Sequence, residues 1–115
     1  MRNTNKQSTR YWSDLMEKSI CKALGGEQQS NSGAGYFHKG DVVVDDMLIE
    51  AKTSMSSKAS VSIKKEWLDK NKDEARSIRK SNSALAFRFE PEGENYYIID
   101  EKLMKFLAEK LREDE

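Results

Sequence analysis

The chain has 115 residues, of which 37% are hydrophobic and 35% are charged, and its formal net charge at pH 7 is zero. This length predicts one domain with a small core, and the balanced charge excludes a polyelectrolyte of one sign. A single cysteine, Cys21, excludes an internal disulfide and indicates a reducing compartment.

Two further absences bear on location. No apolar run approaches the roughly 20 residues that a membrane span requires, and the N-terminus lacks the apolar core of a signal peptide. We therefore expect a soluble, cytoplasmic protein with no membrane partner.

The first predicted element is a helix that begins near Ser8 or Thr9 and ends at Gly25, after a polar, basic tail over residues 1–8. Residues 9–115 are expected to form the single domain. Glu17 lies on the flank of the apolar stripe of this helix, from which a carboxylate can reach a neighbouring sheet. It is either a functional acid or a solvated one.

Residues 27–40 are predicted to form a loop, with room for a short first strand. Gly33 and Gly35 lack the flanking strand and helix of a nucleotide-binding fingerprint, so we expect no nucleotide cofactor. His38 is the only histidine, which excludes a multi-histidine zinc site and disfavours a Ser-His-Asp triad.

A hairpin is predicted over residues 41–52, because two β-branched and apolar runs flank Asp45-Asp46. A two-residue turn makes Asp41 the direct partner of Glu50. Like charges in that position are destabilising, whereas a divalent cation between them would be attracted. Strand alternation puts Lys52 on the same face as Glu50. The alternative is a solvated surface hairpin with another register.

The residue pattern in the second half of the chain predicts a further strand, a helix, two strands and a last helix. A short strand is expected at 61–63, a helix from about 64 to 80, strands at 84–89 and 96–99, and a helix capped by Asp100. The apolar stripe of the last helix is expected to be buried; its members are Leu103, Met104, Leu107, Ala108 and Leu111.

The predicted order is α-β-β-β-α-β-β-α, which indicates an α/β fold with a mixed sheet flanked by helices. The acidic hairpin lies between basic segments at 1–13 and 58–80. This pattern suits a metal site that attracts a polyanion, and it is equally typical of solvated helices.

This order, with these residues at these places, resembles the PD-(D/E)xK nuclease superfamily, and within it the archaeal-type Holliday junction resolvases and their phage relatives. The resemblance covers roughly residues 10–90. It includes Glu17, the Ser/Gly loop at 30–35, Asp41-Val42-Val43 and Ile49-Glu50-Ala51-Lys52. Gly40 stands where the family motif has its proline. The implied fold is the restriction-endonuclease-like sheet.

The resemblance implies a Mg²⁺-dependent endonuclease that hydrolyses DNA phosphodiester bonds, with Mn²⁺ able to substitute. Asp41 and Glu50 would hold the metal together with the backbone carbonyl of Ala51, and Glu17 would complete the shell. Lys52 would orient or deprotonate the attacking water. The catalytic set is then Glu17, Asp41, Glu50 and Lys52.

The implied partner is DNA, most simply a four-way junction cut by a homodimer with one active site in each copy. The helix after residue 100 is the expected dimer interface. The candidate DNA contacts are Arg10, Ser30, Ser32, His38, Lys39, Lys58, Lys64 and Lys65. The host would be an archaeal, bacterial or phage-infected cell.

Two alternatives remain open at this stage. One is the same chemistry on a flap, a single strand, or a restriction or repair substrate, because substrate choice lies in surface shape. The other is a non-catalytic DNA-binding module that keeps the fold.

Overall fold

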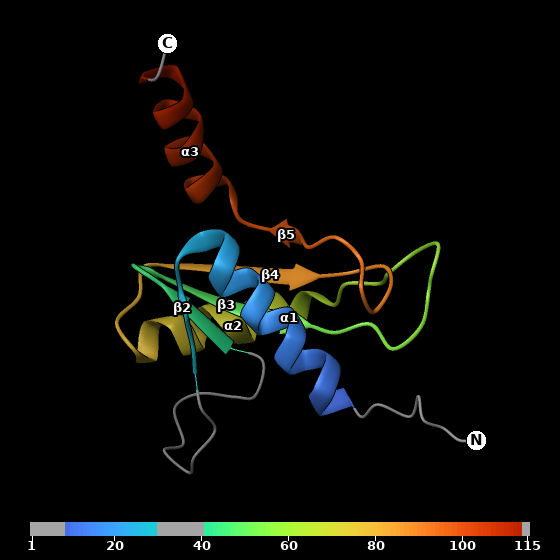
Figure 1. Cartoon of the computed structure of the whole chain (residues 1–115). Coiled ribbons are helices and arrows are strands. Elements are labelled where there is room, and N and C mark those ends of the chain that lie inside the picture. The colour runs from blue at the N-terminus through green and yellow to red at the C-terminus, as the bar shows by residue number, and fades with distance from the viewer. Residues whose placement is uncertain (1–8, 30–40, 114–115) are drawn as a thin grey trace, which may run out of the picture.

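The computed structural model of the chain describes residues 9–29 and 41–113. Its elements follow the order α-β-β-β-α-β-β-α, as Figure 1 shows. They are α1 (Thr9–Leu24), β1 (Glu27–Gln28), β2 (Asp41–Val44), β3 (Met47–Lys52), α2 (Lys65–Ser77), β4 (Asn82–Phe87), β5 (Tyr96–Ile98) and α3 (Glu101–Glu113). The predicted α/β class and element order are confirmed. The tail over residues 1–8 lies outside the described residues.

The five strands form one mixed sheet in the spatial order β1-β2-β3-β4-β5. β3 and β4 are parallel, and the other three neighbouring pairs are antiparallel. Parallel neighbours require a crossover connection, and α2 lies within that crossover.

The hairpin between β2 and β3 has the register predicted from the sequence. Asp41 pairs with Glu50, and Val44 pairs with Met47 across the two-residue turn. Asp45 in the turn has φ 49°, a left-handed conformation that Asp tolerates better than most residues.

The main core lies between α1 and one face of the sheet. Met16 and Ile20 of α1 are fully buried and pack in one cluster with Val42, Ile49 and Ala84. α1 ends at Leu24, directly before the predicted stop at Gly25, whose φ of 78° favours glycine and whose N–H donates to the carbonyl of Cys21 at 2.8 Å.

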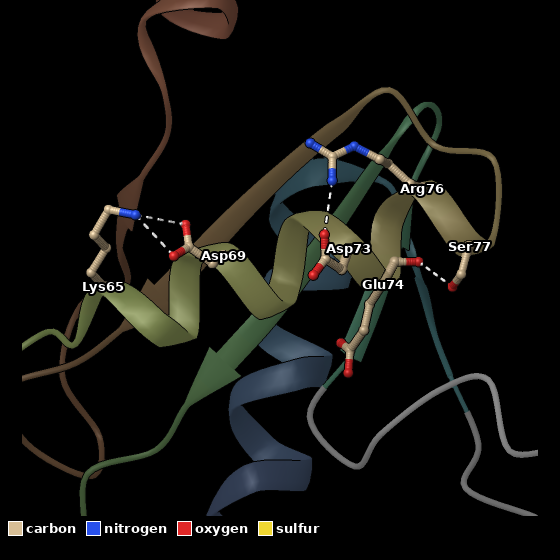
Figure 2. Close-up of polar contacts among 6 residues, drawn as sticks. All are labelled: Lys65, Asp69, Asp73, Glu74, Arg76 and Ser77. Carbon is tan, nitrogen blue, oxygen red and sulfur yellow. Dashed lines mark hydrogen bonds and ion pairs between the residues drawn. The ribbon is translucent and has the colours of Figure 1, made fainter.

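α2 packs on β3 and β4, and Asn71 and Ala75 are its buried residues. The Asn71 side chain donates from Nδ2 to the carbonyl of Ala84 at 2.8 Å, which ties the helix to the central strand. The outer face of α2 is charged, and Figure 2 shows Lys65 paired with Asp69 there. The helix is therefore amphipathic, with its polar side in solvent.

One predicted strand and several predicted boundaries were wrong. Residues 61–63 form no strand: the crossover from β3 to β4 passes outside the ladder, so its apolar residues are only half-buried. α2 ends at Ser77 rather than near 80, because Arg79 adopts φ 62°. β4 begins at Asn82, two residues early, since the Asn82 N–H donates to the Asp46 carbonyl at 3.1 Å.

α3 does not bury its apolar stripe as predicted. Only Leu103 is buried, whereas Met104, Leu107 and Leu111 are 57%, 41% and 71% exposed. The reason is visible in Figure 1, where α3 points away from the sheet beyond β5. Within the described ranges, no helix is long and apolar enough to cross a membrane.

Candidate active site

The central feature of the site is a pair of carboxylates at the open end of the β2–β3 hairpin. Asp41 is fully buried, and the side chain of its partner Glu50 is 18% exposed. Residues directly opposite on neighbouring strands have Cβ atoms about 5 Å apart, so the two side chains share one face at short range. Two acids held together in a half-buried place favour a bound cation.

Lys52 lies on the same face, two residues after Glu50. Its Nζ is 3.2 Å from Glu50 Oε2 and 4.4 Å from the centre of the Trp67 ring. Trp67 in the first turns of α2 therefore covers the ammonium by a cation–π contact and orients it toward the carboxylate. Helical periodicity alone does not reveal this contact, because it identifies the face of the helix on which Trp67 lies and not the residue that this face meets.

Glu17 lies on the other side of the sheet from this pair. The face of the sheet that packs on α1 carries Val42, Ile49 and Ala51, and these alternate with Asp41 and Glu50 along the strands. A hydrogen bond also shows that α1 lies against this face: the hydroxyl oxygens of Ser13 in α1 and Thr53 at the end of β3 are 2.9 Å apart. Glu17 is thus not brought beside Lys52.

Glu17 contacts β1 through a hydrogen bond with Gln28. Gln28 Nε2 donates to Glu17 Oε1 at 2.8 Å and to Asp14 Oδ1 at 2.7 Å, which fastens α1 to the edge strand. The carboxylate is nearly fully buried. A ligand role for Glu17 stays a prediction.

Cys21, one turn after Glu17, suits packing better than chemistry. Burial raises the pKa of its thiol, and the nearby charges of Glu17 and Glu27 raise it further. A neutral thiol is a poor nucleophile.

The residues at this site provide some of the oxygen ligands that a hard cation takes. Asp41 and Glu50 supply carboxylate oxygens, and Ala51 follows the last β2–β3 pair, next to Glu50. Mg²⁺ is commonly held by one or two carboxylates and keeps several waters, so this set is adequate for it. Among the described residues, however, no group of three or more His, Cys, Asp or Glu side chains is placed to hold a metal.

Two of the candidate DNA-binding cations lie near this end of the hairpin. Lys64 occupies the N-cap position of α2, and its Nζ is 5.8 Å from the centre of the Trp67 ring, which also contacts Lys52. Arg10 is exposed one turn before Ser13, in the part of α1 that adjoins the end of β3. Lys64 therefore adds positive charge on the Lys52 side of the sheet, whereas Arg10 lies on the α1 side.

The other candidates are placed differently. Lys65 is paired with Asp69 on the outer face of α2, at 2.9 Å (Figure 2). Lys58 is exposed, and its backbone N–H donates to the carbonyl of Phe89 at 2.8 Å. Four further candidates lie outside the described residues: Ser30, Ser32, His38 and Lys39.

Comparisons of the chain with protein-family models, with curated proteins and with solved structures find no match.

Proposed function

We propose that this protein is a metal-dependent DNA endonuclease, most simply a Holliday junction resolvase. The observation that carries the proposal is the buried Asp41 directly opposite Glu50, with Lys52 bonded to the second carboxylate at 3.2 Å. A hairpin selected for stability alone would not place two acids there. The proposal also uses the resemblance of the motif residues to the PD-(D/E)xK nucleases.

Asp41, Glu50 and the Ala51 carbonyl would hold Mg²⁺, which supplies Lewis-acid activation of a phosphate and of a bound water. Asp41 would act as a rigid ligand because it is fully buried at the start of β2. Glu50 is partly exposed and therefore faces the side from which a substrate can approach.

Lys52 would stabilise the negative charge that develops on the attacked phosphate and would orient the attacking water. The Trp67 ring at 4.4 Å restricts the ammonium to the neighbourhood of Glu50. Positioned in this way, the charge needs little reorganisation during the reaction.

Lys64 and Arg10 would contact the DNA backbone on either side of the carboxylate pair. Backbone contacts give affinity without sequence reading, which agrees with selection by DNA shape. A resolvase cuts two strands related by a two-fold axis, so the acting species would be a homodimer.

The test is cleavage of a labelled, immobile four-way junction in Mg²⁺, beside matched linear duplex, flap and single-strand substrates. Glu50→Gln removes a ligand charge while preserving shape, so it should bind DNA but not cut it. Asp73→Asn, which removes a carboxylate from the outer face of α2, is the matched control and should cut normally.

Paired symmetric nicks at the junction, absent with Glu50→Gln, would support the proposal in full. Preferential cutting of another substrate would keep the chemistry and reject the junction. Binding without cutting of any substrate, in Mg²⁺ or Mn²⁺, would reject the enzyme in favour of a DNA-binding module.

A further inference from the structure

α3 presents an apolar stripe that its own chain leaves uncovered. Met104, Leu107 and Leu111 recur at the i, i+3, i+7 spacing of one helix face, and each is at least 41% exposed. An isolated helix of this length is only marginally stable in water, because most helical stability in proteins comes from packing an apolar face. The 13-residue α3 therefore calls for a covering surface.

The first turn of α3 is firmly attached, so the rest of the helix has a defined direction. Asp100 accepts a hydrogen bond from the Leu103 N–H at 3.0 Å and pairs with Lys72 at 3.0 Å. Lys102 Nζ donates to the carbonyl of Ser81 at 3.0 Å. Beyond these contacts α3 points away from its own sheet (Figure 1).

A groove beside the start of α3 provides a surface of matching character. It lies between α2 and the β4–β5 side of the sheet, has a volume of about 290 Å³, and is lined by Asp100 itself. Its apolar part is formed by Leu68, Leu85, Ile98 and Ile99. A cavity of about 150 Å³ accommodates a benzene ring, so this groove has room for about two large side chains.

We propose that two copies of this chain form a dimer by exchanging α3, so that the apolar stripe of each copy docks in the groove of the other. The reciprocal contact is isologous, as two-fold symmetry requires. Two-fold symmetry repeats the helix–groove contact, so the dimer buries twice the area of a single contact.

Charge favours a second copy as the occupant. The rim of the groove carries Lys65 and Lys72 with Asp69 and Asp100, and α3 likewise carries both signs. A zero net charge for the whole chain removes long-range repulsion between copies. A polyanion or a strongly charged protein would instead call for a surface of one sign. The proposal does not depend on the nuclease activity.

The first test measures mass in solution by light scattering, without DNA or metal, at about 100 µM, above the micromolar range expected for a modest interface. The wild-type protein should show twice the 13.2 kDa of one chain. Leu107→Lys with Leu111→Lys should weaken self-association by at least about 100-fold and leave a folded monomer, since both residues are exposed within one copy.

Phe106→Lys is the matched control. Phe106 is 52% exposed, but it lies about 160° around the helix from Met104, off the stripe. This variant should remain a dimer. A wild-type monomer at this concentration, or equal dissociation of the control and the double variant, would overturn the proposal.

The second test locates the contact by disulfide trapping in a Cys21→Ser background. A chain with Leu111→Cys, mixed with a chain with Leu68→Cys, should give a covalent dimer on oxidation. A dimer that persists without this cross-link would overturn docking in the groove. A chain carrying both cysteines that closes on itself as a monomer would show that α3 covers its own groove instead, which also overturns the exchange.

Discussion

Glu50→Gln should uncouple the stability of this protein from divalent metal. In the wild-type chain, Asp41 and Glu50 are direct cross-strand partners, and Lys52 lies 3.2 Å from Glu50 on the same face. The substitution keeps the shape of the side chain but removes one of the two charges that a cation would bind.

The magnitude follows from the geometry. Two carboxylate charges about 6 Å apart repel by about 3 kcal/mol at an effective dielectric constant near 20. The ion pair with Lys52, which the variant loses, is partly exposed and contributes about 0.5–1 kcal/mol. In chelator the variant should therefore be no less stable than the wild-type protein.

Metal should narrow this difference by stabilising the wild-type protein alone. Mg²⁺ at ten times its dissociation constant would add about 1.4 kcal/mol to the free energy of unfolding of the wild-type protein. For a domain of this size that corresponds to a rise in Tm of about 5–10 °C. Glu50→Gln should show little or none of this increase, because a single carboxylate binds Mg²⁺ weakly.

The assay is thermal unfolding followed by circular dichroism in EDTA and across a MgCl₂ titration, with Asp73→Asn as the control. The control should respond to metal like the wild-type protein, since Asp73 pairs with Arg76 on the outer face of α2, away from the hairpin. An equal metal-induced rise in Tm in Glu50→Gln and the wild-type protein would refute the metal site at this hairpin.

Three further changes test other parts of the structure. Lys52→Ala should slow DNA cleavage at least about 100-fold while the metal-induced rise in Tm persists; normal turnover would remove Lys52 from the mechanism. Gly26→Ala should lower the free energy of unfolding, measured in urea, by about 2–3 kcal/mol. The added Cβ would lie 2.7 Å from the Val43 carbonyl oxygen and against the Val44 side chain. Unchanged stability would contradict this packing. Asp100→Ala should cost about 1 kcal/mol by loss of a helix cap. The Leu103 N–H, and then Lys72, hold the pKa of the Asp100 carboxyl below its ordinary 3.8, so its contribution should be present above that pH and lost as the pH falls through the lower folded value. Urea unfolding of the wild-type protein and the variant between pH 3 and pH 7 measures this, and a difference that grows on acidification would contradict the sign.

Much of the local structure was predictable because its determinants are short-range. The positions of α1, α2 and α3 follow from helical spacing, and Gly25 and Asp100 mark boundaries by ordinary capping geometry. Errors arose where tertiary contacts decide. The apolar residues 61–63 lack a neighbouring strand, and β4 was extended toward its N-terminus by contacts with Asp46.

The sequence by itself determined the hairpin register, and with it the meeting of Asp41 and Glu50, because a two-residue turn and strand alternation leave one pairing. Only the tertiary structure decided which helix covers which face of the sheet. That choice places Trp67 against Lys52, puts Glu17 on the opposite side, and leaves the stripe of α3 uncovered. Periodicity identifies an apolar face, but the surface that covers it depends on the packing of segments far apart in the chain.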